Sequence, residues 1–245
     1  MQLEFIGSGD AFGSGGRFHT CFHVTGDAVN FLIDCGASSL IALNARNIKI
    51  NRIQAIFITH FHADHFGGIP FFMLDAQFFS KREAPLTIAG PKGLRTWFER
   101  VMETAFPGSS KTKPGFELSL VELEPGMPLK QNGVNAHPYP VNHGSPGGPY
   151  FGYRFEAGNR IISYTGDTAW TDGLIRMAAA ADLFIAESYF YDKKVKLHLD
   201  YQTLVSRLPF LTPKRLVLTH MSDEMLNRLD TIPHEAAYDG KVITL

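Results

Sequence analysis

A short run of metal-ligand side chains, placed directly after an apolar stretch, constrains this chain more than any other feature. His60, His62, Asp64 and His65 fall within six consecutive residues, immediately downstream of the apolar residues 53–58. Imidazole and carboxylate groups suit zinc and other divalent first-row metals. The apolar stretch is typical of a buried strand, and ligands at a strand end rest on a rigid support. The run therefore predicts a metal site beside a sheet.

The local conformation of this run decides how its side chains are aimed. On an extended segment, alternation would place His60, His62 and Asp64 on one side, with His65 turning away. A turn could instead aim all four groups at two neighbouring ions, and the glycine pair at 67–68 allows such a turn. The alternative is a histidine-rich surface loop without metal. That alternative gives no reason for a ligand string between a buried strand and a glycine pair.

Three further ligand-type residues follow short apolar stretches later in the chain, namely His143, Asp167 and His220. Each has an ordinary interpretation when taken alone. A histidine after a strand is commonly a hydrogen-bonded polar residue, and Asp167 could cap a helix. Together with the first run, the three residues favour metal ligation. Zinc is the default ion for a histidine-rich site, and manganese or iron fits the same ligands.

Composition and charge limit the partners and the compartment. The net charge of −1 gives no global attraction to nucleic acid or to an anionic membrane. No apolar run approaches the length of a membrane span, and the first residues carry no basic leader. The only cysteines, Cys21 and Cys35, fit a reducing compartment and are expected to be buried. We therefore expect a cytoplasmic protein without a membrane partner.

Alternating apolar patterns predict an α/β protein. The expected strands span residues 3–6, 21–24, 29–33, 53–58, 86–89, 117–123, 134–139, 151–155, 161–164, 183–186, 216–218 and 242–245. The expected helices span residues 38–47, 70–79, 92–106, 172–181 and 200–208. Strands followed by helices, twice over, suggest two β-α layers packed sheet to sheet. We expect one domain over residues 1–245, with halves of roughly 1–115 and 116–245.

A glycine-rich loop at residues 7–16 lies between the first two expected strands. Its backbone N–H groups could bind an anion, but it lacks the lysine and the spacing of a phosphate-binding P-loop. His19, which is close to this loop, is a candidate to face a substrate. His23, His137 and His234 have no ligand-like neighbours, so we expect them to be structural or exposed.

The chain resembles the metallo-β-lactamase-fold hydrolases, and most closely their ribonuclease Z-like branch. The resemblance covers nearly the whole length and is carried by residues 7–9, 33–36, 59–68, His143, 166–168, 186–188, 196–198 and 218–220. The metal string at 59–68 is the most specific of these motifs. The resemblance implies a four-layer αββα sandwich of the metallo-β-lactamase type and a metal-dependent hydrolase.

The resemblance also implies a role for each ligand residue. One divalent metal ion would be held by His60, His62 and His143, the second by Asp64, His65 and His220, and Asp167 would bridge both. A hydroxide between the two ions would attack the substrate. Asp64 could in addition orient the nucleophilic water.

Two further residues gain catalytic roles from the same resemblance. His198 would stabilise developing negative charge or protonate the leaving oxygen. Glu187 would fix the tautomer of His198 and raise its basicity. The alternative for His198 is a surface position near a helix start, because Asp200 beside it is typical of a helix N-cap.

One departure from the branch bears on the substrate. Short ribonuclease Z enzymes carry a long arm that grips transfer RNA between the third ligand motif and the bridging aspartate. Here the interval between His143 and Asp167 is short and already holds two expected strands. Without that arm, and with little net charge to neutralise phosphates, long RNA is disfavoured as a partner. We expect a small-molecule substrate, a cyclic or nucleotide-like phosphodiester, and a homodimer is compatible with the sequence.

Two alternative functions stay open at this point. The same metal site could hydrolyse a lactone, a thioester or another acyl bond, with the phenylalanines from Phe71 to Phe79 lining an acyl pocket unless they belong to the core. A non-hydrolytic metal-binding protein is the other alternative. The di-iron oxidoreductases of this fold carry glutamate at the position of His62, which disfavours the redox form of that alternative.

Overall fold

The strands of the computed structural model, which describes residues 1–144 and 150–245, form two seven-stranded sheets. In the first sheet the order is β14-β1-β2-β3-β4-β5-β6. Its strands are β1 (Gln2–Gly7), β2 (Cys21–Thr25), β3 (Asn30–Ile33), β4 (Ala55–Phe57), β5 (Leu86–Pro91), β6 (Leu118–Leu123) and β14 (Val242–Thr244). The last strand thus returns to the first sheet, where Thr244 pairs with Gln2.

The second sheet has the order β13-β12-β11-β10-β9-β8-β7. Its strands are β7 (Leu129–Gln131), β8 (Val134–Pro140), β9 (Phe151–Ala157), β10 (Arg160–Tyr164), β11 (Leu183–Glu187), β12 (Leu216–Thr219) and β13 (Glu235–Ala236). Strands β7 to β10 are antiparallel, whereas β10 to β13 are parallel. Because β8 and β10 both oppose β9, their carboxyl ends meet at the same edge of the sheet as those of β11 and β12.

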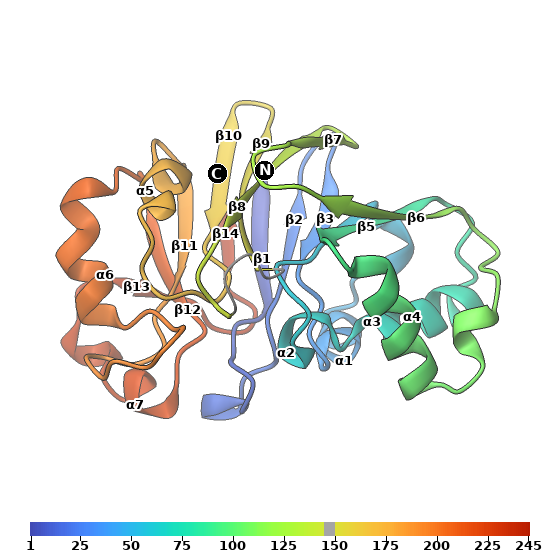
Figure 1. Cartoon of the computed structure of the whole chain (residues 1–245), viewed down its shortest axis with the longest axis horizontal. Helices are drawn as coiled ribbons and strands as arrows, with labels where there is room; N and C mark the ends of the chain where they lie inside the picture. Colours follow the sequence, from blue (N-terminus) through green and yellow to red (C-terminus); the bar gives the residue numbers. More distant parts are fainter. Residues whose placement is uncertain (145–149) are drawn as a thin grey trace.

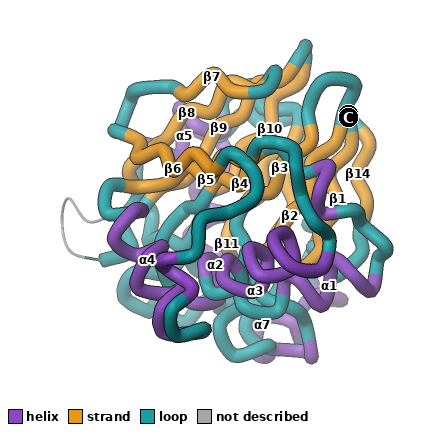
Figure 2. Tube along the Cα trace, turned by 90° about the vertical axis from the view of Figure 1, so that its right-hand side faces the viewer, coloured by secondary structure: helices purple, strands orange, loops and turns teal. Residues whose placement is uncertain are grey.

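The helices lie outside the two sheets. Figure 1 shows α1 to α4 beside the first sheet and α5 to α7 beside the second. These helices are α1 (Ser39–Ala45), α2 (Ala63–Phe66), α3 (Ile69–Leu74), α4 (Leu94–Ala105), α5 (Gly173–Ala178), α6 (Tyr201–Arg207) and α7 (Asp223–Leu226). Figure 2 shows α1 and α3 running along the same side of the sheet that contains β2 to β5.

The apolar core lies in three layers that hold this arrangement together. Between the sheets, Phe57 of β4 packs edge-on against Phe155 of β9, with ring centroids 5.1 Å apart. Outside the first sheet, Phe72 of α3 is buried in a separate apolar cluster. Outside the second sheet, Leu204 of α6 packs in a third cluster with Phe184 of β11. Helix, sheet, sheet and helix therefore follow one another, which confirms the expected αββα sandwich.

Most expected elements are found, and the ones missed are short. Strand β7 has the sequence Leu-Lys-Gln and β13 has the sequence Glu-Ala, so each holds a single apolar residue and shows no apolar pattern. A signal for β7 was nevertheless present in Asn132 and Gly133. Both residues adopt positive φ and connect β7 to β8, as an asparagine-glycine hairpin turn requires.

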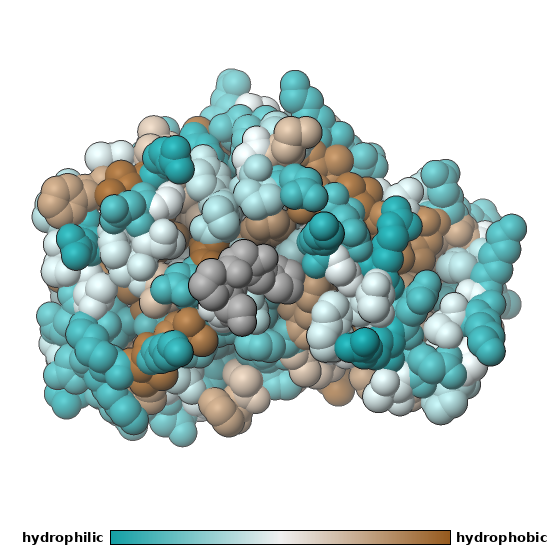
Figure 3. Space-filling view, viewed as in Figure 1, coloured by the Kyte–Doolittle hydropathy of each residue, from teal (hydrophilic) through white to brown (hydrophobic). Residues whose placement is uncertain are grey.

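The surface and the helices bear on the expectation of a protein without a membrane partner. On the face shown in Figure 3, hydrophilic residues separate the apolar ones into several patches. Among the helices of the described ranges, none is both long enough and apolar enough to cross a bilayer.

Candidate metal centre

The ligand run of the first sheet leaves β4 and enters a helical turn. Strand β4 ends at Phe57, His62 precedes the first turn of α2, and Asp64 and His65 lie within that turn. A helix rotates successive side chains by about 100° instead of 180°. As a result His65 does not turn away, as the extended alternation predicted: its Nε2 lies 3.3 Å from Asp64 Oδ2. The helical turn thus brings His65 to the same side as Asp64.

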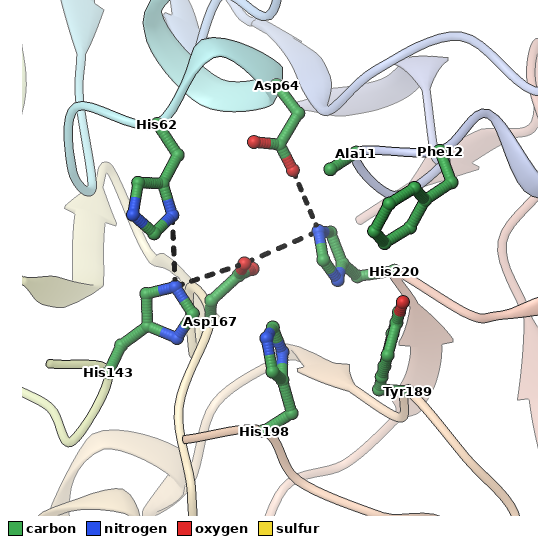
Figure 4. Close-up of a pocket in the computed structure, with 9 residues that line it drawn as sticks. All are labelled: Ala11, Phe12, His62, Asp64, His143, Asp167, Tyr189, His198 and His220. Carbon is green, nitrogen blue, oxygen red and sulfur yellow. Dashed lines mark hydrogen bonds and ion pairs between the residues drawn. The ribbon is translucent and has the colours of Figure 1, made fainter. Parts of the chain in front are cut away.

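Three of the expected ligands form a first cluster on one side of the site. One ligand atom each of His60, His62 and His143 lies within 4.8 Å of the others. His143 Nε2 is 3.2 Å from His62 Nδ1, and Figure 4 shows these two side chains pointing toward one another. His60 and His143 are buried, while His62 is exposed.

The other four ligands form a second cluster, which is buried throughout. It consists of Asp64, His65, Asp167 and His220, again with ligand atoms within 4.8 Å of one another. His220 Nε2 lies 3.2 Å from Asp64 Oδ2, and His65 Nε2 lies 3.2 Å from Asp167 Oδ1. Asp167 Oδ2 is also 3.7 Å from His143 Nε2, so Asp167 stands between the two clusters (Figure 4). The fold thus brings together all seven residues expected as ligands.

Unpartnered buried atoms test whether a metal fits these clusters. Within the described part of the chain, the buried His60 Nε2 has no hydrogen-bond partner, and His65 Nε2 and Asp167 Oδ1 make no hydrogen bond although they lie 3.2 Å apart. Leaving such atoms without a partner is unfavourable, and buried charges are ordinarily paired or bound to a metal. Imidazole nitrogens with carboxylate oxygens are a suitable donor set for a divalent cation. The two clusters therefore fit divalent metal binding.

The carboxylates and imidazoles of the second cluster shift one another's pKa. Burial alone would raise the pKa of Asp64 and Asp167, but His65 and His220 hold the pKa of both carboxyls well below its usual value. Burial would conversely lower the pKa of His65, which the surrounding aspartates raise well above its ordinary value. In the first cluster burial dominates and lowers the pKa of His60, which leaves that imidazole neutral. The second cluster therefore concentrates ionised carboxylates, and the first presents neutral imidazole.

A second layer of hydrogen bonds orients the imidazoles. His65 Nδ1 donates to Asp34 Oδ2 across 2.8 Å, and His143 Nδ1 donates to the backbone oxygen of Leu197 across 2.9 Å. Such partners fix the tautomer and ring orientation of a metal-binding histidine. Asp34 belongs to one of the motifs of the resemblance, but the sequence alone predicted no such role for it. The signal was its position: a carboxylate directly after β3, which is parallel to β4.

Glu187 and His198 lie together beside the second cluster. Nδ1 of His198 is hydrogen-bonded to Glu187 Oε1, while Glu187 Oε2 accepts from the backbone N–H of Thr168 at 2.8 Å. Burial tends to lower the pKa of His198, but the Glu187 carboxylate raises it overall. Glu187 Oε1 also lies 3.4 Å from His220 Nδ1. Ligand atoms of Asp167, Glu187, His198 and His220 form a further group within 4.8 Å.

The helix start on which the alternative interpretation of His198 depends is present. Asp200 does cap α6, because its carboxylate accepts from the backbone N–H of Thr203 at 2.9 Å. His198 nevertheless lines the cavity at the metal centre, with its side chain 23% exposed. Tyr189 stacks on it, with ring centroids 4.8 Å apart.

The cavity at the centre has a volume of about 160 Å³. Beyond the cluster residues, Ala11, Phe12, Tyr189 and His198 line it (Figure 4). Phe12 and Tyr189 were not predicted as site residues, although Phe12 stands in the glycine-rich loop and Tyr189 lies just past the glutamate motif. His19 is not among the lining residues.

The phenylalanines proposed for an acyl pocket do not reach this cavity. Phe72 is buried in the core, whereas Phe71, Phe78 and Phe79 are exposed on α3 and the helical turn that follows it. None of the four lines the cavity. These phenylalanines therefore do not form the acyl pocket that was expected of them at the metal centre.

The glycine-rich loop differs from the open anion site that we considered. The buried Asp10 carboxylate accepts from the backbone N–H groups of Phe12 and Ser14, at 3.2 and 2.9 Å. The N–H of Gly15 donates to Asp223 at 2.8 Å. The Asp10 and Asp223 carboxylates thus already accept hydrogen bonds from backbone N–H groups that an anion would need.

Comparisons with known proteins agree with this geometry. A family model described as "Anti-Pycsar protein Apyc1" matches residues 1–235. Ribonuclease Z of Geobacillus kaustophilus is 26% identical, over 91% of this chain and 88% of its own. The crystal structure of human tRNase Z, short form, has a TM-score of 0.80 and 26% identity, covering 100% of this chain and 99% of that one. A diphosphatase from the PhnP family, at 22% identity, also reaches a TM-score of 0.80 over 100% of this chain and 97% of its own, which shows the fold alone.

Proposed function

This chain belongs to the family described as anti-Pycsar protein Apyc1, and from that membership and its site geometry we propose that it hydrolyses a small phosphodiester, cyclic or nucleotide-like, at a dinuclear metal centre. Its similarity to ribonuclease Z and tRNase Z confirms the ribonuclease Z-like resemblance and indicates a metal-dependent hydrolase of the phosphodiesterase type. The dinuclear centre and the small substrate are the parts that we propose.

The observation that carries the proposal is the pair of donor clusters joined through Asp167. We assign His60, His62 and His143 to one ion, and Asp64, His65 and His220 to the other. Support for a shared Asp167 comes from its two oxygens: Oδ1 is 3.2 Å from His65 of one cluster, and Oδ2 is 3.7 Å from His143 of the other.

The metal ions and the side chains would contribute different parts of the hydrolysis. When bound, two divalent cations supply Lewis-acid chemistry, lowering the pKa of water and stabilising charge on the phosphoryl oxygens. Asp64 lines the cavity as an ionised carboxylate, because His65 and His220 keep its pKa low. It is thereby suited to accept a hydrogen bond from the attacking water and orient it toward phosphorus.

His198 is suited to protonate the leaving oxygen. Its Nδ1 is held by Glu187, so its Nε2 is the nitrogen left to deliver a proton. Glu187 raises the pKa of His198, which favours the protonated imidazole near neutral pH. Glu187 holds that proton donor in place. Its carboxylate is hydrogen-bonded to His198, Thr168 and Leu199 and forms an ion pair with His220.

The size of the site favours a small substrate over long RNA. A cavity of about 160 Å³ is smaller than the roughly 300–1,000 Å³ of pockets that enclose a drug-sized ligand. Between His143 and Asp167, β9 and β10 occupy most of the interval that would have to hold an RNA-gripping arm. Both observations support a phosphoryl group at the centre with its substituents at the rim.

A metal-reconstitution assay tests this proposal. The chelated protein is reloaded with zinc or manganese and assayed on a cyclic mononucleotide, on bis(p-nitrophenyl) phosphate and on an acyl lactone. We expect metal-dependent turnover of the phosphodiesters, two equivalents of bound metal and little lactone hydrolysis. An Asp167→Asn variant should lose activity and metal, whereas His234→Ala, whose imidazole bonds Tyr201 outside the site, should lose neither. Turnover of the lactone alone would overturn the proposal in favour of acyl hydrolysis.

A further inference from the structure

Phe12 presents a large aromatic side chain to solvent at the rim of the metal cavity. Its side chain is 82% exposed, and it is one of the residues that line the cavity. Single exposed apolar residues are common on protein surfaces and by themselves indicate nothing. What distinguishes Phe12 is its combination of exposure, position and a rigidly held backbone.

The backbone around Phe12 is anchored on both sides. The buried Asp10 carboxylate accepts from the N–H groups of Phe12 and Ser14, and also from the Ser14 hydroxyl at 2.9 Å. Further along, Gly15 N–H donates to Asp223 at 2.8 Å. The loop therefore fixes the backbone from which the exposed ring projects, which lowers the loop-ordering entropy lost when a ligand packs against that ring.

Phe12 lies on one particular side of the cavity. Figure 4 shows Phe12 and Tyr189 on the side of His220, away from His62 and His143. Tyr189 is already stacked against His198. The Tyr189 ring is thus stacked on the proposed proton donor, and Phe12 is the exposed ring on the same side of the cavity as Tyr189.

The small cavity requires part of a nucleotide-sized substrate to lie outside it. Its volume of about 160 Å³ accommodates a phosphoryl group at the two clusters but not the whole of a nucleotide. A group attached to the phosphoryl centre must extend over the rim, where Phe12 is available for stacking. Every nucleobase offers a π face to such a ring.

We propose that Phe12 is a specificity-determining residue that stacks on the nucleobase of the substrate and so selects base-bearing phosphodiesters. The inference rests on the proposed phosphodiesterase function and adds to it a residue for base recognition. Stacking depends on the presence of a base and little on its identity. Phe12 therefore confers preference for nucleotides without distinguishing strongly among bases.

The test compares a cyclic mononucleotide with its abasic analogue, in which hydrogen replaces the base. Phe12→Ala is expected to lower kcat/KM for the cyclic mononucleotide by about 5- to 150-fold, the range for loss of one stacked base. It should leave kcat/KM for the abasic analogue within about twofold. Phe12→Trp should retain preference for the base-bearing substrate, because it keeps an aromatic face.

Phe79→Ala is the matched control. Phe79 is 85% exposed, lies on the helical turn after α3 and does not line the cavity, so its removal should change neither substrate. An equal loss on both substrates in Phe12→Ala would assign Phe12 to loop structure and overturn the proposal. An unchanged kcat/KM for the cyclic mononucleotide would overturn it as well.

A binding measurement separates failure of this inference from failure of the proposed function. The probe is a hydrolysis-resistant phosphorothioate of the cyclic mononucleotide, titrated calorimetrically into metal-loaded protein. Absence of turnover on every phosphodiester would overturn the proposed function. Binding of this probe that is equal in wild type and Phe12→Ala would overturn the stacking role, whatever the turnover.

Discussion

Asp34 Oδ2 accepts a hydrogen bond from Nδ1 of His65 across 2.8 Å, and both side chains are fully shielded from solvent. Asp34 Oδ1 also accepts from the backbone N–H of Thr59 at 2.7 Å. One carboxylate at the end of β3 therefore orients an imidazole of the second cluster and holds the segment that leaves β4. The Asp34 backbone is in the left-handed region, with φ of 59°, which asparagine also tolerates.

The first prediction concerns this contact. Asp34→Asn keeps the shape and an acceptor for Thr59 but removes the charged partner of His65. We expect metal affinity to fall by about 10- to 100-fold, the usual effect of losing such a supporting carboxylate. Competition with a metal-binding dye measures the change. Unaltered affinity for both ions would show that Asp34 contributes only to folding.

The second prediction separates a proton donor from a metal ligand at His198. His198→Ala should lower kcat by about 100- to 10,000-fold on a cyclic mononucleotide, whose leaving oxygen needs a proton. The loss should be much smaller on bis(p-nitrophenyl) phosphate, whose leaving group departs without one. Metal content should stay at the wild-type value, and loss of one metal equivalent would instead identify His198 as a ligand.

The third prediction concerns the packing beneath the helical turn of the site. A Cβ at Gly36 would lie 2.2 Å from the backbone oxygen of Asp64 and 2.5 Å from His19 Cβ. Gly36→Ala must therefore displace the Asp64 backbone, and we expect a loss of about 1–3 kcal/mol in the free energy of unfolding together with weaker metal binding. Chemical denaturation and metal titration measure the two effects. Gly115→Ala is the control, because a Cβ there meets no described atom within 4 Å.

The fourth prediction is a pH dependence of stability away from the metal centre. Arg215 donates twice to Glu235, at 2.7 Å each, and together with Lys241 it lowers the pKa of Glu235 to about 2. A lowered pKa in the folded state means that this contribution is complete above the ordinary pKa of 4.5 and is lost as the pH falls toward 2.

Glu235→Gln should therefore be less stable than wild type at neutral pH, and the difference should shrink as the pH falls from about 5 to about 2. The effect should be small because both partners are partly exposed to solvent. Thermal unfolding across this pH range measures it, with the exposed Glu83→Gln as control. A difference that stays constant with pH would contradict the assignment.

Local sequence patterns predicted most of the strands because buried strands carry continuous or alternating apolar residues that can be read within a few positions. The helices that contain Phe72 and Leu204 were also predicted from the sequence. Strand β13 was missed because it has only two residues, Glu235 and Ala236, whose pairing depends on a neighbouring strand and which show no apolar pattern.

By itself the sequence determined the donor chemistry: the run from His60 to His65, with His143, Asp167 and His220, allowed few interpretations besides a metal site. Only the tertiary structure decided how those donors group, because a helical turn aims His65 inward and the parallel strand ends gather residues far apart in the chain. It also decided that Asp34 supports His65 and that Phe12 stands at the cavity rim. Such relationships depend on distances through space, which no spacing along the chain encodes.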